Sequence, residues 1–189
     1  MIDDSELMRR LAGGDQQAFA SLLSRHSKLV LNVAYRIVLS RDDAEDLCQE
    51  VFERLWVHAP EWRDDAKLTT WLYRVANNLA INFRQRVQQR YVLDETLATT
   101  ETDAKIAGDE AGLELARQEN AHLSDITDGT LMEALGRLPV NYRALLAFRF
   151  YRDLPVKEIA EIMGLSAKAV ESQLGRAKAQ LKQNLGGGA

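Results

Sequence analysis

The sequence lacks the features that mark secreted proteins and membrane proteins. Cys48 is the single cysteine among 189 residues, so no internal disulfide can form, which fits a reducing cytoplasm. No apolar run approaches the roughly 18 residues of a membrane span. No basic start followed by an apolar block and a small-residue cleavage site marks the chain for export. We therefore expect a soluble cytoplasmic protein.

The sequence also offers little catalytic chemistry. Its three histidines are scattered, and it contains neither an HExxH pattern nor a Gly-rich phosphate loop. His26 has no second His or Cys three or four residues away, so it fits a packed or surface residue better than a metal ligand. Cys48 lies among apolar residues and fits a small core side chain. We expect no enzymatic activity, no cofactor and no metal.

Charge is distributed unevenly along the chain. The net charge is -4, yet residues 67–90 hold 5 Lys/Arg and no Asp or Glu, and residues 137–189 hold 9 Lys/Arg against 4 Asp/Glu. Residues 91–136 between them hold 2 Lys/Arg against 11 Asp/Glu. Two basic blocks separated by an acidic one indicate two anion-binding units joined by a segment that avoids the same anion.

The first basic block, residues 67–90, has the period of a helix with one buried stripe. That stripe consists of Leu68, Trp71, Leu72, Val75, Ala76, Leu79, Phe83 and Val87. On the other side we expect cations, which hold phosphates, and the amides Asn77, Asn78 and Asn82, which can read base edges. Trp71 and Tyr73 add flat faces on which unstacked bases could rest. The pattern predicts a nucleic-acid helix, and an ordinary amphipathic helix with a solvated basic face remains the alternative.

Three further helices are predicted before this block. They cover residues 3–11, residues 16–39 after a cap at Asp15, and a segment that begins after Ser40 and ends at Pro60. The third helix places Ala44, Leu47, Val51, Phe52, Leu55 and Trp56 on one face and Asp46, Gln49, Glu50 and Glu53 on the other. The acidic row is either a solvated face or a surface for a basic partner protein.

The second basic block carries the most specific local pattern. After a helix over residues 128–138 and a dense apolar run at residues 140–151, residues 156–163 form a short helix, Gly164 and Leu165 turn the chain, and Ser166 caps a second helix. This spacing predicts a helix-turn-helix, whose second helix enters the major groove of DNA. A three-helix bundle with a tight turn is the alternative. The outward set on the second helix is Lys168, Glu171, Ser172, Gln173, Arg176 and Lys178.

Three motifs in this order resemble the extracytoplasmic-function (ECF) class of sigma-70 RNA polymerase sigma factors. DAEDLCQEVFERLW resembles region 2.2, TWLYRVANNLAINFRQR resembles regions 2.3 and 2.4, and DLPVKEIAEIMGLSAKAVESQLGRAKAQLK resembles region 4.2. The resemblance covers nearly everything except the acidic linker. It implies an all-α fold of two small helical domains, with region 2 at residues 1–90, a flexible acidic linker at 91–127, region 4 at 128–185 and a disordered tail at 186–189.

The resemblance also implies partners and site residues. Asp46, Gln49, Glu50 and Glu53 would dock on the clamp helices of the largest polymerase subunit, and region 4 would meet the flap. The minus-10 element would be engaged by Trp62, Trp71, Tyr73, Arg74, Asn78, Asn82, Arg84 and Arg86, with the connector 61–66 capturing a flipped base. The helix-turn-helix set would read the minus-35 element. An anti-sigma protein, often membrane-anchored in this family, is the implied inhibitor, and the implied location is the bacterial cytoplasm.

One competing function comes from a different class. A stand-alone helix-turn-helix regulator would bind duplex DNA as a dimer without polymerase. It would leave the helix with aromatic and amide side chains unexplained.

The recognition helix departs from the family pattern, and this yields a first prediction. Glu171, Gln173 and Gly175 stand where basic and aromatic residues or His are frequent in the family. A carboxylate faces phosphates poorly but can accept a hydrogen bond from cytosine N4, and a good base contact contributes about 1–3 kcal/mol. We expect Glu171→Ala to change the preferred minus-35 base in a randomised promoter library, and an unchanged preference would refute the contact.

Overall fold

The computed structural model describes residues 2–63, 67–97 and 129–186, and the side chains of the second range up to residue 87. All regular structure in these ranges is helical, as predicted. The amino-terminal part contains α1 (Asp4–Ala12), α2 (Gln16–Val38), α3 (Arg41–His58), the 3-10 turn η1 (Ala59–Glu61) and α4 (Leu68–Leu97). The carboxyl-terminal part contains α6 (Gly129–Gly136), α7 (Val140–Leu146), the π-helical turn η3 (Ala147–Tyr151), α8 (Val156–Met163) and α9 (Ala167–Gly186).

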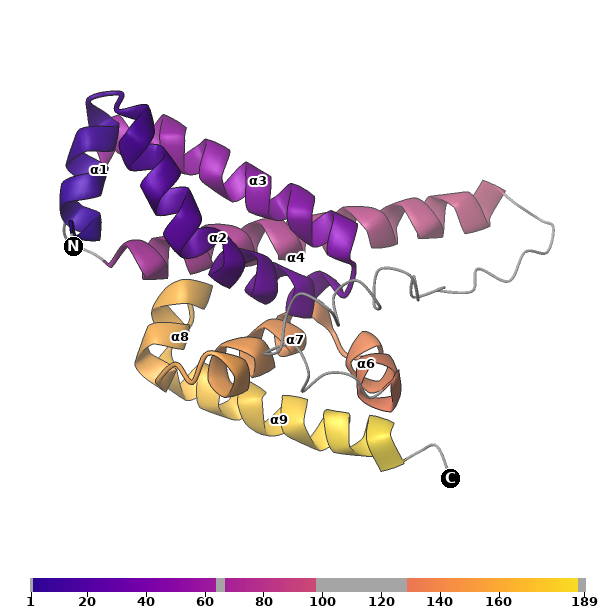
Figure 1. Cartoon of the computed structure of the whole chain (residues 1–189). Helices are drawn as coiled ribbons and strands as arrows, with labels where there is room; N and C mark the ends of the chain where they lie inside the picture. Colours follow the sequence, from indigo (N-terminus) through magenta and orange to yellow (C-terminus); the bar gives the residue numbers. More distant parts are fainter. Residues whose placement is uncertain (1, 64–66, 98–128, 187–189) are drawn as a thin grey trace.

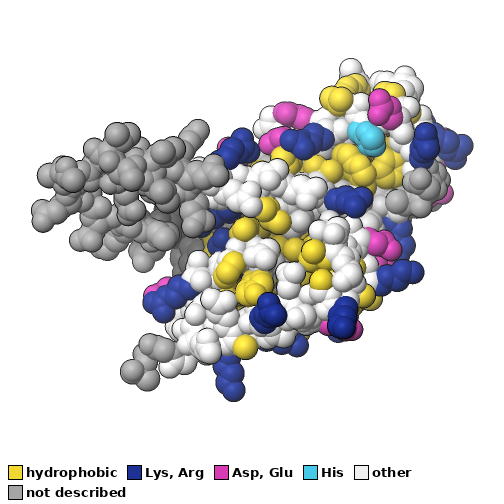
Figure 2. Space-filling view, turned by 180° about the vertical axis from the view of Figure 1, so that it is seen from behind, with side chains coloured by type: hydrophobic (Ala, Val, Ile, Leu, Met, Phe, Trp, Pro, Cys, Tyr) yellow, Lys and Arg dark blue, Asp and Glu magenta, His cyan; other side chains and the backbone are white. Residues whose placement is uncertain are grey.

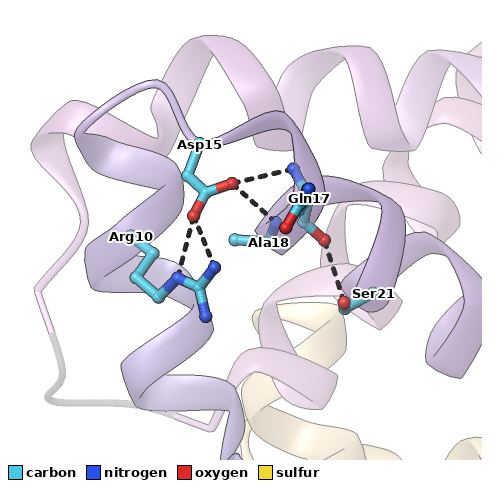
Figure 3. A network of polar contacts seen from close by, with 5 residues as sticks. All are labelled: Arg10, Asp15, Gln17, Ala18 and Ser21. Atoms are coloured by element: carbon cyan, nitrogen blue, oxygen red, sulfur yellow. Dashed lines mark hydrogen bonds and ion pairs between the residues drawn. The ribbon is translucent and has the colours of Figure 1, made fainter.

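Short polar side chains set the helix starts of the first bundle. Asp15 caps α2, because its Oδ1 accepts hydrogen bonds from the backbone N–H groups of Gln17 at 2.8 Å and Ala18 at 3.2 Å (Figure 3). Its Oδ2 accepts from Arg10 Nε at 2.8 Å and Nη2 at 2.6 Å, which ties the end of α1 to the start of α2. Ser40 caps α3 in the same way, with its Oγ accepting from the Asp43 N–H.

The helix-turn-helix has the predicted boundaries. Gly164 ends α8 in the left-handed conformation, with φ of 66°, where a side chain would be strained. Ser166 Oγ then accepts a hydrogen bond from Ala169 N–H at 3.2 Å and starts α9. Ile159, Ile162, Val170 and Leu174 are buried between the two helices and the rest of the bundle.

The two bundles pack directly on each other (Figure 1). Helix α4 lies against α8 and α7, and α2 lies against α7 and η3. One cluster of buried apolar side chains runs from the first bundle into the second, so the described part of the chain has a continuous core. The carboxyl-terminal end of α4 projects beyond both bundles (Figure 1).

Some boundaries and burial expectations differ from the structure. Helix α4 continues to Leu97, seven residues beyond residue 90, where the predicted basic helix ended. Trp56 was expected in the core but is 38 % exposed, and Phe150 in the dense apolar run is 57 % exposed. Most of the predicted linker, residues 98–127, and residues 187–189 of the predicted tail lie outside the described residues, whereas Gly186 belongs to α9.

No helix in the described ranges is both long and apolar enough to cross a membrane.

The double role of Asp15 predicts a pH dependence of stability. Hydrogen bonding from Arg10, followed by that from the Ala18 amide, lowers the pKa of Asp15 below its ordinary 3.8. Because the pKa of Asp15 is lower in the folded state than in the unfolded state, ionised Asp15 stabilises the fold at pH values above the unfolded-state pKa. This stabilisation is lost as the pH falls through the folded-state pKa. Asp15→Asn keeps a good cap but cannot ionise. We expect its Tm to be lower than that of the wild type at pH 7 and the difference to shrink below about pH 4.

Thermal unfolding followed by circular dichroism between pH 2.5 and 7 measures this difference. A difference that stays constant over the whole range would show that the charge of Asp15 does not contribute.

Candidate nucleic-acid and partner-binding surfaces

The acidic face of α3 consists of Asp46, Gln49, Glu50 and Glu53, as predicted by their spacing. All four lie opposite the buried Ala44, Leu47, Val51 and Leu55 and are exposed or half-exposed. Gln49 Nε2 donates to Glu53 Oε1 at 2.8 Å, and Arg54 Nη2 pairs with Glu50 Oε1 at 2.6 Å. These bonds connect residues one turn apart and leave acceptor oxygens for a partner. The face can therefore receive cationic side chains.

An apolar surface adjoins the carboxyl-terminal end of the acidic face, and the sequence analysis missed it. Trp56 is 38 % exposed and Val57 77 % exposed, and Leu23 on α2 is also exposed. The rings of Trp56 and Phe19 pack edge to face with centroids 5.2 Å apart, which fixes the position of Trp56. A mixed acidic and apolar surface is typical of a protein-binding site. The hint in the sequence was the pair Trp56-Val57, because a single helix face cannot bury both.

Helix α4 presents three different sides. Leu68, Leu72, Ala76 and Leu79 are buried in the first bundle, as predicted. Four of the predicted DNA-binding residues, Arg74, Asn78, Asn82 and Arg86, are exposed and recur at intervals of four, so they form one stripe along the helix. Arg86 Nε donates to the Asn82 backbone carbonyl at 3.4 Å. The stripe combines cations for phosphates with amides for bases.

The third side of α4 faces the second bundle, and two predicted exposures are wrong there. Tyr73 is 3 % exposed, with its ring 5.6 Å from that of Phe148, so it offers no open face to a base in this arrangement. Asn77, one turn later, is also buried. Arg84 lies at this side, half-buried, and its charge acts on Arg143 of α7. Periodicity did not reveal this side because its residues are aromatic, amide and basic.

Buried polar atoms without a hydrogen-bond partner gather at this contact. Within the described residues they include Tyr73 Oη, Asn77 Oδ1, Arg143 Nε and Arg152 Nε. Burial, followed by the charge of Arg84, lowers the pKa of Arg143 to about 10. Burial likewise raises the pKa of Tyr73 to about 12, with the nearby Arg152 opposing the shift. Buried polar atoms usually have hydrogen-bond partners, so this contact is less favourable than the apolar core of the first bundle.

The predicted tryptophans form a cluster at the start of α4. The imidazole of His58 stacks on Trp71 with centroids 5.5 Å apart and an interplanar angle of 6°, and Trp62 meets Trp71 edge-on at 6.2 Å. Trp62 and Trp71 are both half-buried. Trp62 Nε1 is buried without a partner among the described residues. The connector residues 64–66, predicted to help capture a base, lie outside the described part.

The second helix of the helix-turn-helix exposes its predicted outward set. Lys168, Glu171, Ser172, Arg176 and Lys178 are exposed, and Gln173 is half-buried. Lys178 Nζ lies 4.8 Å from the centroid of the Phe150 ring, a cation–π contact that turns it toward η3. Figure 2 shows Lys and Arg side chains around several patches of apolar side chains on one face of the molecule, with fewer acidic ones. Such a face suits a polyanion.

Neither Cys48 nor the histidines form a reactive or metal-binding centre in the described structure. No group of three or more His, Cys, Asp or Glu side chains could hold a metal within these ranges. His26 Nε2 lies 2.8 Å from Asp4 Oδ2, so this largely buried ring connects α2 to α1. Cys48 Sγ is 3.6 Å from the carbonyl oxygen of Ser27, and burial raises its pKa to about 11.

Comparison with known families and proteins assigns both parts of the chain to one family. The model of sigma-70 region 2 matches residues 22–91, and that of sigma-70 region 4 matches residues 128–181. The chain is 31 % identical to the RNA polymerase sigma factor NccH of Alcaligenes xylosoxydans xylosoxydans, over 94 % of this chain and 92 % of that protein. It is 30 % identical to the ECF RNA polymerase sigma-E factor of Escherichia coli K12, over 94 % and 91 %.

Solved structures extend the likeness to the whole fold. CnrH, in complex with the cytosolic domain of CnrY, matches with a TM-score of 0.66 and 26 % identity, covering 98 % of this chain and 99 % of CnrH. The sigma factor RpoE of Bartonella quintana, in complex with the anti-sigma factor NepR, matches with a TM-score of 0.65 over 90 % and 98 % of the two chains. At 19 % identity the second match shows a shared fold alone.

The burial of Cys48 predicts a slow thiol. With a pKa of about 11 instead of 9.0, the thiolate fraction at pH 8 falls about a hundredfold. We expect the reaction with iodoacetamide to be at least that much slower in the folded protein than in guanidinium chloride. A folded-state rate within tenfold of the unfolded one would contradict the burial.

Proposed function

This chain belongs to the ECF class of the sigma-70 family of RNA polymerase sigma factors, and from that membership we propose which surfaces bind polymerase and which read the promoter. Members of the family are non-enzymatic, and the chain directs transcription initiation through RNA polymerase. The assignment of individual residues rests on the surfaces described above.

The acidic face of α3 is the core-polymerase surface. Asp46, Gln49, Glu50 and Glu53 lie together in solvent, in a protein whose DNA partner would repel them. An acidic face of this kind suits a basic partner surface, which we assign to the clamp helices of the largest polymerase subunit. The exposed Trp56 and Val57 give the same interface an apolar contact beside the charged one.

The stripe on α4 reads the minus-10 element. Arg74 and Arg86 frame Asn78 and Asn82, so the cations hold the backbone while the amides meet base edges. Trp62 and Trp71 supply stacking surfaces near the connector 61–66, where a base leaves the duplex. Tyr73 and Arg84 join this surface only when the second bundle moves away, since both now face it.

Helix α9 reads the minus-35 element in duplex DNA. Ser166 starts the helix, so Lys168, Glu171 and Ser172 lie in its first turns, the part that reaches base edges in a helix-turn-helix. Arg176 and Gln173 follow on the same outward set, and Lys178 lies next to the exposed Phe150. The apolar Phe150 is available for a protein contact such as that with the polymerase flap.

An anti-sigma factor completes the partners, and the protein works in the bacterial cytoplasm. CnrH and RpoE, which share this fold, are described in complex with CnrY and with the anti-sigma factor NepR. The polymerase and promoter surfaces of this chain lie on both bundles, so a polypeptide that wraps both would block them together.

One observation carries the proposal: a single chain exposes an acidic polymerase face, an amide and basic stripe on α4, and a helix-turn-helix recognition face. A stand-alone regulator would need only the last of these. The test is transcription in vitro with core polymerase, this protein and fragmented genomic DNA, with transcript starts mapped. We expect starts that share two short elements at minus-35 and minus-10, and their absence would overturn the proposal.

We predict that reversing one charge on the acidic face weakens binding to core RNA polymerase. Glu53→Lys puts a cation opposite the cationic clamp surface, and we expect at least a tenfold loss of affinity, about 1.4 kcal/mol, that diminishes as salt rises. Glu6→Lys, the same charge change on α1, is the matched control. Titration of labelled protein with core polymerase measures both, and equal affinities would place the polymerase surface elsewhere.

A further inference from the structure

Gly175 is the one glycine in the described ranges that lies well inside a helix. It is the ninth of the twenty residues of α9. The other described glycines start a helix, end one or turn the chain after one: Gly13, Gly14, Gly129, Gly136, Gly164 and Gly186. Alanine is more favourable than glycine inside a helix, so Gly175 does not help α9 to form.

The fold does not require a glycine at this position. A Cβ atom added at Gly175 would have no atom within 4 Å outside the local helix backbone. The backbone there is helical, and positive φ occurs at other glycines, such as Gly164. Packing and conformation in the described structure would therefore both accept a side chain, and its lack is felt only on the solvent side of α9.

Gly175 lies at the centre of the outward face of α9. Residues three, four and seven positions away share one side of a helix. Around Gly175 all of these residues are exposed, and they are Lys168, Glu171, Ser172, Lys178, Ala179 and Lys182. The buried Val170, Leu174 and Ala177 face the bundle instead. The glycine is thus surrounded by the side chains that we assign to DNA.

A glycine at this place has no group with which to read a base. Bases are distinguished by side chains that bond or touch their edges in the major groove. The backbone N–H and C=O groups of a residue inside a helix already bond to each other along the helix. Glu171 and Ser172 lie about one turn before Gly175, and Lys178 lies about one turn after it. Side chains can therefore reach the base pairs on either side of the one that faces Gly175.

We propose that Gly175 leaves an unread position inside the minus-35 element. The base pair that faces Gly175 is accepted whichever base it carries, while the pairs on either side of it are selected. The inference rests on the proposed function of α9. It makes Gly175 a residue that determines specificity by contributing no contact.

The test adds a reading group at Gly175 and asks whether a new base preference appears. Holoenzyme made from core polymerase and the full-length protein transcribes a promoter library in which the minus-35 element is randomised. The minus-10 sequence is held fixed as found by transcript mapping, and the templates that give transcripts are sequenced. For the wild type we expect selected bases on both sides of a position without preference.

Two substitutions should fill this position with different bases. Gly175→Gln adds an amide that pairs with adenine N6 and N7, and Gly175→Arg adds a guanidinium that pairs with guanine O6 and N7. We expect a preference of at least about fivefold for an A·T pair in the first variant and for a G·C pair in the second, both at the unread position. Gln183→Arg puts the same cation on an exposed residue about two turns later and should change no base preference.

Gly175→Ala distinguishes an unread position from a close approach of the helix backbone to DNA. We expect its Tm to rise by about 2–4 °C, because alanine favours the helix. The affinity of its holoenzyme for a wild-type promoter should stay within about twofold of the wild-type value. A larger loss would mean that α9 needs the glycine to approach the DNA, and this would overturn the inference.

Two further results would overturn the unread position alone. One is a wild-type minus-35 element with a preferred base at every position between its first and last selected pairs. The other is the lack of any new preference in both Gly175→Gln and Gly175→Arg. Failure of the proposed function looks different, because the wild type would then give no promoter-dependent transcripts, or transcripts with no base preference anywhere in the randomised element.

Discussion

The packing of α4 on two of its sides is the interaction on which the described structure depends. Leu72 and Ala76 are fully buried in the first bundle, while Tyr73, one residue along, is buried against Phe148 of the second. Because adjacent residues on a helix point about 100° apart, α4 can belong to both cores at once. Only one narrow side remains for solvent, and the exposed stripe of Arg74, Asn78, Asn82 and Arg86 fills it.

The contact of α4 with the first bundle is more favourable than its contact with the second bundle. Inside the first bundle, apolar side chains meet apolar side chains, and burial of each large one contributes about 1.5–3 kcal/mol. At the seam, which is the contact of α4 with α7, η3 and α8, Tyr73 and Phe148 lie beside polar atoms without hydrogen-bond partners and beside the like charges of Arg84 and Arg143. A partner needs only a few kcal/mol of differential affinity to shift such an equilibrium. The contact between α4 and the second bundle is therefore easier to break than the apolar core of the first bundle.

The sequence predicted the parts of the fold that local rules decide. Helical periods, the caps at Asp15, Ser40 and Ser166, and the turn at Gly164 depend on neighbours within a few residues, and the structure has all of them. The acidic face of α3 and the outward face of α9 followed from the same periodicity. These features need no knowledge of what lies on the other bundle.

The side of α4 that faces the second bundle could not be predicted in this way. Tyr73, Asn77 and Arg84 look like a polar, DNA-reading side because their residue types favour that role. Their burial depends on Phe148, 75 residues after Tyr73, and on Arg143, 59 residues after Arg84, both beyond the acidic segment. Periodicity carries no information on contacts at such separation. The exposure of Trp56 was missed for a similar reason, since how far its ring is covered depends on its contact with Phe19 of α2, 37 residues earlier in the chain.

The packing of the two bundles brings the two basic blocks of the chain together. The two basic blocks meet at the seam, where Arg84 and Arg143 repel each other, although each block alone is suited to DNA phosphates. A polyanion between the bundles would relieve that repulsion, whereas closure without an anion leaves it in place. The stripe on α4 and the face of α9 lie away from this contact, so both stay exposed to phosphates while the bundles are packed together.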